Sequence, residues 1–215
     1  MANCETFQLP AVEAEAHQVR EVLRCLLNTI LFNRALGYVR PVDVDSDLLD
    51  LTYVTVGEPD LQAALEQRIS ELCSAVERCP PAEVAQVQLS FYERRQRQAW
   101  FGAKDERLHW EQWVISLVVA SPAVSLSRSA LASGSERSCQ GEDQSEQLRE
   151  GMEAALTHIT RCVSERRDHI PPVVSSATLT FPYDVTITWG GQRSAFSLSS
   201  VKKALLQASP PPMIG

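Results

Sequence analysis

The sequence has no long hydrophobic run. No apolar stretch approaches the roughly 18 residues that a membrane-spanning helix requires, and the first residues lack the apolar centre of a secretory signal peptide. We therefore expect a chain that has no transmembrane segment and works in the cytoplasm.

Positive charge is in short supply. The chain carries 20 Lys and Arg against 27 Asp and Glu, which gives a formal net charge of −7. Proteins that bind nucleic acid need positive surface against the phosphates. The one basic cluster here (Arg94, Arg95 and Arg97) is short and is soon followed by acids. The charge balance argues against nucleic acid as the main partner.

Paired cysteines are missing too. The six cysteines form no CxxC motif and are scattered along the chain (Cys4, Cys25, Cys73, Cys79, Cys139 and Cys162). Free thiols in a reducing cytosol explain this pattern better than a disulfide framework or a zinc site.

Recognisable catalytic motifs are absent. The sequence has no GxSxG elbow, Walker loop or GxGxxG fingerprint, and its histidines (His17, His109, His158 and His169) show no HExxH spacing. We interpret each histidine as a surface or packing residue, and we expect a protein that is not an enzyme and needs no cofactor. Because dispersed residues can also assemble an active site, an enzyme with an unrecognised site stays open as an alternative.

The segment DVDSDLLD at 43–50 resembles the start of a calcium loop, with Asp43, Asp45 and Asp47 at alternate positions. A calcium loop has glycine at its sixth position and glutamate at its twelfth, where this chain has Leu48 and Val54. We therefore expect no metal here and interpret the segment as a solvated loop that leads into a strand.

Hydrophobic periodicity predicts three long helices. Apolar residues recur every three or four positions over 17–36, 59–78 and 146–166. Gly37 suits the end of the first helix and Pro59 the first turn of the second. A short helix is also expected near 200–207.

Alternating apolar and polar residues predict strands between the helices. They cover residues 5–16, 48–56, about 86–91, 112–119, 179–181, 184–189 and 194–198. Pro10 fits an edge strand, and the Gly190–Gly191 pair indicates a hairpin turn. The order of elements predicts an α+β fold in one domain, with a mostly antiparallel sheet packed against three long helices.

Residues 121–147 are rich in serine, glycine and charge and show no apolar period. Such a segment cannot bury enough surface to offset the entropy of ordering its backbone. We interpret it as a flexible Ser-rich insertion within the domain, and residues 209–215 as a frayed tail.

The most informative segment is LSFYERRQRQAWFGAKDERLHWEQWVISLVV at 89–119. Trp100 and Phe101 stand in the middle of a polar stretch, which we interpret as a long charged loop between two half-buried antiparallel strands. An aromatic side chain that stays in water gives up the roughly 1.5–3 kcal/mol of stabilisation that its burial would supply. An exposed anchor for a partner protein accounts for them. The alternative is a loop that folds back and buries them in its own base.

Three segments resemble the autophagy-related protein 101 family of HORMA-domain proteins. They are DVDSDLLDLTYVTV (43–56), the amphipathic helix after it, and residues 87–119, where the charged loop returns through Trp110 and Trp113 into a strand. The similarity is clear over 17–119, and the C-terminal third matches in pattern around HIPPV and FPYDVTITW. Residues 121–147 look like an insertion relative to the family.

The resemblance implies a single HORMA domain over residues 1–215 with no enzymatic activity. Family members pair with the HORMA domain of autophagy-related protein 13 and stabilise it within the autophagy-initiating kinase complex. Their exposed aromatic loop, called the WF finger, recruits downstream factors to the forming autophagosome, and this role carries onto Trp100 and Phe101. The family finger usually has a proline between its aromatics. Here the two are adjacent and Gly102 follows, so in an extended segment their side chains point to opposite sides.

Another HORMA adaptor, of the spindle-checkpoint or polymerase-associated kind, is the nearest alternative. Such adaptors wrap a peptide with their C-terminal segment and have no aromatic finger, so a pull-down of partners distinguishes the two. For the enzyme alternative, thermal stabilisation by a metal or a nucleotide is the discriminating measurement.

Overall fold

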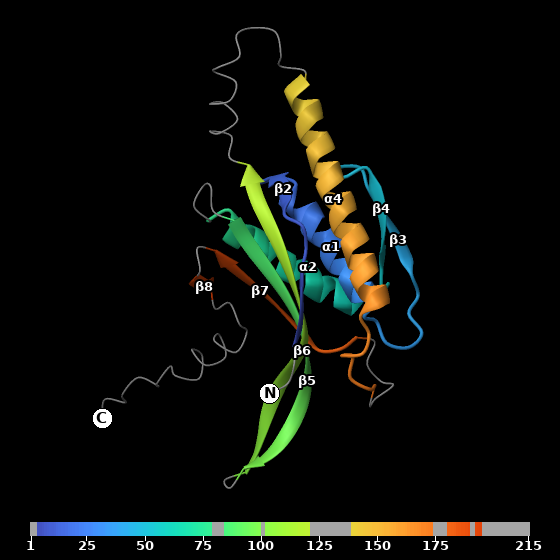
Figure 1. The fold of residues 1–215 in the computed structure, drawn as a ribbon, viewed down its shortest axis with the longest axis vertical. Helices are drawn as coiled ribbons and strands as arrows, with labels where there is room; N and C mark the ends of the chain where they lie inside the picture. Colours follow the sequence, from blue (N-terminus) through green and yellow to red (C-terminus); the bar gives the residue numbers. More distant parts are fainter. Residues whose placement is uncertain are drawn as a thin grey trace, which may run out of the picture.

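The computed structural model of the chain describes residues 4–78, 84–99, 102–120, 139–173, 180–189 and 192–194. Its main sheet has the strand order β1-β6-β5-β7-β8, with β2 also beside β6, and a separate sheet joins β3 and β4 (Figure 1). The strands are β1 (Glu5–Gln8), β2 (Val12–Glu15), β3 (Val42–Ser46), β4 (Leu51–Thr55), β5 (Val84–Ala99), β6 (Gly102–Ala120), β7 (Tyr183–Trp189) and β8 (Gln192–Ser194). The helices are α1 (Val19–Asn33), α2 (Pro59–Val76) and α4 (Cys139–Glu165). The fold is α+β, as predicted.

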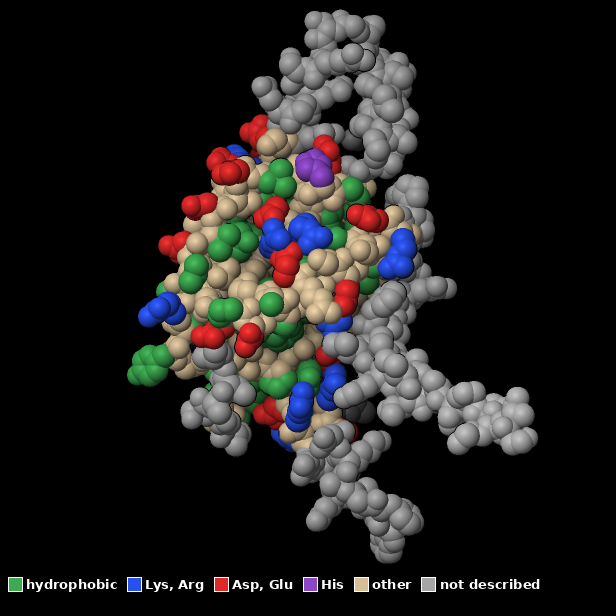
Figure 2. All heavy atoms as spheres, turned by 180° about the vertical axis from the view of Figure 1, so that it is seen from behind, with side chains coloured by type: hydrophobic (Ala, Val, Ile, Leu, Met, Phe, Trp, Pro, Cys, Tyr) green, Lys and Arg blue, Asp and Glu red, His purple; other side chains and the backbone are tan. Residues whose placement is uncertain are grey.

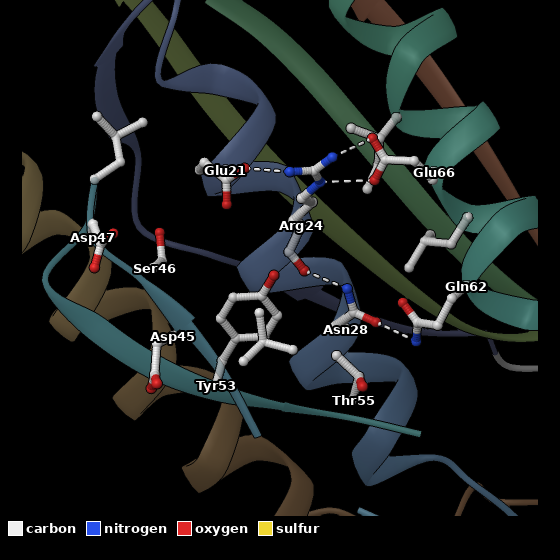
Figure 3. A pocket seen from close by; sticks show the side chains of 14 residues that line it. Glu21, Arg24, Asn28, Asp45, Ser46, Asp47, Tyr53, Thr55, Gln62 and Glu66 are labelled. Atoms are coloured by element: carbon white, nitrogen blue, oxygen red, sulfur yellow. Dashed lines mark hydrogen bonds and ion pairs between the residues drawn. The ribbon is translucent and has the colours of Figure 1, made fainter. Parts of the chain in front are cut away.

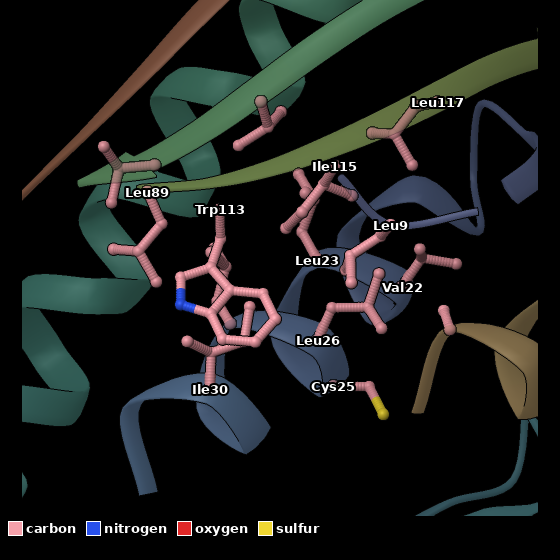
Figure 4. Packing of buried hydrophobic residues seen from close by; sticks show 14 of the residues in the cluster. Leu9, Val22, Leu23, Cys25, Leu26, Ile30, Leu89, Trp113, Ile115 and Leu117 are labelled. Atoms are coloured by element: carbon pink, nitrogen blue, oxygen red, sulfur yellow. The ribbon is translucent and has the colours of Figure 1, made fainter. Parts of the chain in front are cut away.

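Helix α1 lies at the centre of the hydrophobic core. Its apolar stripe includes Leu23, Leu26 and Ile30, all fully buried. Figure 4 shows these side chains packed against Trp113 and Ile115 of β6. Burying one such side chain stabilises the fold by roughly 1.5–3 kcal/mol. The face that the sequence predicted as apolar is therefore core.

Helix α2 follows its prediction closely. It begins at Pro59, in the first turn, where the missing N–H of proline leaves no helical hydrogen bond unmade. Leu65, Ile69 and Leu72 of this helix are buried, and α2 packs beside α1.

Helix α4 begins at Cys139, before the predicted start at residue 146. The prediction of a flexible insertion was therefore wrong for residues 139–147, while residues 121–138 lie outside the described residues. Glutamine and glutamate favour helix, so they can prolong one that the apolar stripe from Leu148 onward has nucleated. Where α4 crosses β2, a Cβ on Gly151 would lie 3.9 Å from Val12.

The middle of the sheet is built from β5, β6 and β7, paired antiparallel. Leu89 pairs with Trp113 on one side and with Val185 on the other. The predicted edge strand at the N-terminus is confirmed in two pieces, because β1 and β2 both run parallel to β6 and are separated at Pro10. The backbone N–H of Leu9 donates a hydrogen bond to the carbonyl of Val114, with 2.9 Å between nitrogen and oxygen.

The β3–β4 hairpin replaces part of the predicted solvated loop. Asp45 of β3 pairs with Thr52 of β4, and its carboxylate accepts a hydrogen bond from the Thr52 hydroxyl at 2.7 Å. The loop prediction was wrong because alternating Val and Asp is itself a strand pattern that places the acids on the solvated face. Gly57 follows the hairpin with φ +75°, and a Cβ there would lie 2.5 Å from the Arg40 carbonyl oxygen.

The C-terminal strands agree in part with the prediction. Strand β7 confirms the strand expected at 184–189, and Thr180 forms a single β-bridge with Ala35. Strand β8 begins just before the strand expected at 194–198. The predicted Gly190–Gly191 turn, the helix near 200–207 and the tail at 209–215 lie outside the described residues.

Charged side chains of both signs are interspersed over the back of the molecule (Figure 2). Within the described ranges, no helix is long and apolar enough to cross a membrane. The same residues contain no cluster of three or more His, Cys, Asp and Glu side chains that could hold a metal ion.

Candidate functional site: an arm that ends in two aromatic residues

Strands β5 and β6 continue past the sheet as a two-stranded arm, defined here as residues 93–99 and 102–108 (Figure 1). β7 pairs with β5 only as far as Phe91, and β1 pairs with β6 only from Glu111 onward. Among the described strands, the arm therefore pairs only with itself. Ala99 pairs with Gly102, so the register holds to the end of the arm. The predicted long charged loop was wrong.

The arm escaped prediction because its described side chains are exposed or half-buried, with none buried. Arg95 pairs with Glu106 and Arg94 with Arg107 across the arm, and all four side chains are exposed. On β5, Arg95 also binds Glu93 at 3.0 Å. A strand that is solvated on both faces has no apolar alternation to detect, although cross-strand pairs and backbone hydrogen bonds stabilise it.

The arm leaves the sheet at a β-bulge. Phe91 pairs with Glu111 and Tyr92 with His109, so Trp110 is the extra residue on β6. Trp110 is buried, stacks on Phe91 with 5.6 Å between ring centroids, and meets Phe181 edge-on at 4.8 Å. A bulge bends its strand and increases the local twist, so this buried residue sets the direction in which the arm leaves the body.

Arg107 ties the first residues of the arm to the sheet. Its guanidinium lies 2.6 Å from the Asp184 carboxylate of β7 and 4.9 Å from the centroid of the Tyr92 ring. A planar guanidinium can bind a carboxylate and stack on an aromatic ring at once. The root of the arm is therefore held by polar as well as apolar contacts.

A buried ion pair lies below the root. Glu111 is fully buried and Arg34 is 4% exposed, with their charged atoms 2.8 Å apart. The indole N–H of Trp113 donates to Glu111 at 2.5 Å, and Nε2 of His169 lies 2.6 Å from the same carboxylate. This cluster joins β6 to the end of α1 and to the segment after α4. Sequence reasoning missed it, since nothing distinguishes Glu111 from its polar neighbours.

The described cysteines (Cys4, Cys25, Cys73 and Cys162) are free thiols, as predicted. Burial raises the pKa of Cys25 to about 12. Burial also raises the pKa of Cys73 and of Cys162 above the ordinary thiol value. Because the thiolate is the reactive form, these side chains are poor nucleophiles at neutral pH.

The predicted site residues Trp100 and Phe101 lie outside the described residues. The pairing of Ala99 with Gly102 leaves these two residues as the link between β5 and β6. We call this two-residue link in the sequence the tip of the arm. The prediction that the pair forms an exposed anchor stays a prediction.

Known proteins of one family are similar to this sequence. The family profile described as Autophagy-related protein 101 matches residues 11–177. Autophagy-related protein 101 of Arabidopsis thaliana is 36% identical, over 99% of this chain and 100% of that protein. The protein of the same name in Schizosaccharomyces pombe is 27% identical over 79% of this chain and 83% of its own. The human protein of the same name is 29% identical over 59% of this chain and 62% of its own length. The chain therefore belongs to the autophagy-related protein 101 family, and its role lies in autophagy.

Proposed function

We propose that the protein is a non-catalytic adaptor of autophagy initiation, built as a single HORMA domain over residues 1–215. It pairs with the HORMA domain of autophagy-related protein 13 and stabilises it within the initiating kinase complex. At the site where the autophagosome forms, it recruits downstream factors through Trp100 and Phe101. Membership of the family supports the partner and the complex, and the arm supports the recruiting role.

The observation that supports the proposal is the arm, whose two strands are linked in the sequence by the adjacent Trp100 and Phe101. The described side chains of the arm are exposed or half-buried, so the arm offers no core of its own. A paired, anchored support presents its tip with little loss of entropy on binding. Tryptophan is among the residues that contribute most at protein interfaces.

The double substitution Trp100→Ala, Phe101→Ala tests this role. We expect the free energy of unfolding to change by no more than ~0.5 kcal/mol, as at other surface sites. Recruitment of downstream autophagy factors should be lost, while pairing with the HORMA domain of autophagy-related protein 13 persists. Chemical unfolding and co-purification from native cells measure the two effects.

Two further variants serve as controls. Arg94→Ala, Arg95→Ala removes charge from the arm and keeps its aromatics, so recruitment should persist. Phe91→Ala empties a fully buried site at the root and should cost about 3–5 kcal/mol. A loss of 2 kcal/mol or more from the tip double variant, on the order of a buried aromatic, would mean that the pair is core and the proposal is wrong.

A further inference from the structure

A pocket of about 550 Å³ opens between the β3–β4 hairpin and helices α1 and α2 (Figure 3). Buried Tyr53, Leu65 and Ile69 line its apolar part. Its volume is in the range of small-ligand sites. None of its lining residues belongs to β5 or β6, so the pocket is separate from the arm.

The charges around the pocket disfavour an anion. Arg24 is the only cation among its described lining residues, and its guanidinium is already engaged by Glu21 and by both carboxylate oxygens of Glu66. The hydrogen bond from Arg24 holds the pKa of Glu66 below its ordinary value, so Glu66 stays ionised at neutral pH. Asp45 and Asp47 add two more carboxylates, which leaves the lining with an excess of negative charge.

Two lining groups can still accept a hydrogen bond. Ser46 is 7% exposed, and its hydroxyl has no hydrogen-bond partner among the described residues. Figure 3 shows it between Asp47 and Tyr53, and within the described part of the chain no side chain pairs with the exposed carboxylate of Asp47. The amides of Asn28 and Gln62, by contrast, are bonded to each other at 3.0 Å. Buried hydroxyls nearly always have a partner, so Ser46 is suited to accept from a ligand.

We propose that this pocket binds an arginine side chain of a partner protein. A guanidinium carries a fixed charge and five N–H donors in a planar fork, and it can therefore donate to a carboxylate and a hydroxyl at once. Lysine offers a single, strongly hydrated point charge instead. Leu48 is 41% exposed beside Asp47, which gives the methylene stem of arginine an apolar surface to cover. The site is a second contact for partners, independent of the aromatic tip.

Nuclear magnetic resonance of the full ¹⁵N-labelled chain tests the proposal with N-acetyl-arginine methylamide as the probe. We expect saturable shifts of the Ser46, Asp47 and Tyr53 amides. The citrulline analogue, which keeps the shape and loses the charge, should bind about tenfold more weakly or not at all. The corresponding lysine compound should also bind more weakly.

Substitutions localise the effect. Asp47→Asn should weaken binding of the arginine compound by about fivefold, and Ser46→Ala should weaken it without loss of folding. Asp43→Asn lies on the same hairpin outside the lining and should change nothing. Absence of saturable shifts would overturn the proposal, as would equal binding of the citrulline or lysine compounds. Equal weakening by Asp43→Asn and Asp47→Asn would indicate attraction by the acidic hairpin as a whole and would also overturn it.

Discussion

The carboxylate of Glu111 is fully buried and contacts Arg34, Trp113 and His169. Moving an ion pair out of water costs several kcal/mol, and attraction offsets this cost only where hydrogen bonding is complete. Arg34 reaches both oxygens of Glu111 through Nε at 3.0 Å, and the other two side chains each add a contact. Completeness of this kind makes the cluster sensitive to the loss of any member.

Glu111→Gln should be among the most destabilising conservative changes in the chain. It leaves the charge of Arg34 buried without a counter-charge, which costs about 3–5 kcal/mol when one partner of a buried pair is lost. Urea unfolding followed by tryptophan fluorescence measures the change.

A second pair of variants separates charge from packing. Arg34→Met combined with Glu111→Leu removes both charges and should cost much less than the sum of the single variants, because contacting residues are not additive. The exposed pair of Arg166 and Glu5 is a matched control, and Glu5→Gln should cost about 1 kcal/mol at most. Equal losses from Glu5→Gln and Glu111→Gln would contradict this account.

Among the elements, the arm has a length and a register that can be changed independently. Deleting the pairs Gln96–Asp105 and Arg97–Lys104 shortens the arm by about 7 Å and preserves the face of every remaining residue, since side chains alternate with period two. We expect stability within ~0.5 kcal/mol of the parent and partial recruitment of downstream factors.

Deleting only Arg97–Lys104 shortens the arm less but turns the tip to the opposite face relative to the root. If orientation governs recognition, this smaller deletion should lose more recruitment than the larger one, in the same co-purification assay. Full recruitment by both variants would show that neither the length of the arm nor the orientation of its tip governs recruitment.

The elements that could be predicted are those with one buried face. Leu23 and Leu27 recur at helical spacing because α1 buries that stripe, and Leu89 alternates with polar neighbours because one face of β5 is core. The arm could not be predicted, since Arg95 and Glu106 are solvated and leave no period. The parallel pairing of Glu5 with Glu111 had no local signal, because such partners are chosen by the packing of the whole sheet.

The candidate site could be predicted only as far as its residue types. Two aromatics in a charged stretch indicated an anchor, but the bulge at Trp110 and the contact of Arg107 with Asp184 join residues far apart in the sequence. The pocket beside Ser46 is likewise assembled from two helices and a hairpin. Tertiary packing brings these groups together, and the spacing of residues within one segment does not predict which groups will meet.

For the molecule as a whole, we expect that the described residues fold without residues 121–138. Strand β6 ends at Ala120, before the segment, and α4 begins at Cys139, after it. Helix α4 packs against β2 and α1. Replacing 121–138 by a short Gly/Ser linker should leave the melting temperature almost unchanged. Extending the replacement to residue 147 removes the start of α4 and the contact of Gln147 with Glu13. This longer replacement should lower the melting temperature more than the shorter one does. A loss of several kcal/mol from the shorter replacement would mean that the segment packs on the core.

The central position of α1 has a consequence for synthesis on the ribosome. The helix is complete at Asn33, whereas the β6 residues that cover it, Trp113 and Ile115, come about 80 residues later, or on the order of 4–16 s at ordinary elongation rates. An isolated helix of this length is marginal in water, so a nascent chain carries an uncovered leucine-rich segment throughout that interval. We therefore expect the yield of the protein in cells to depend on chaperones that shield this segment at the ribosome exit until β6 has been translated.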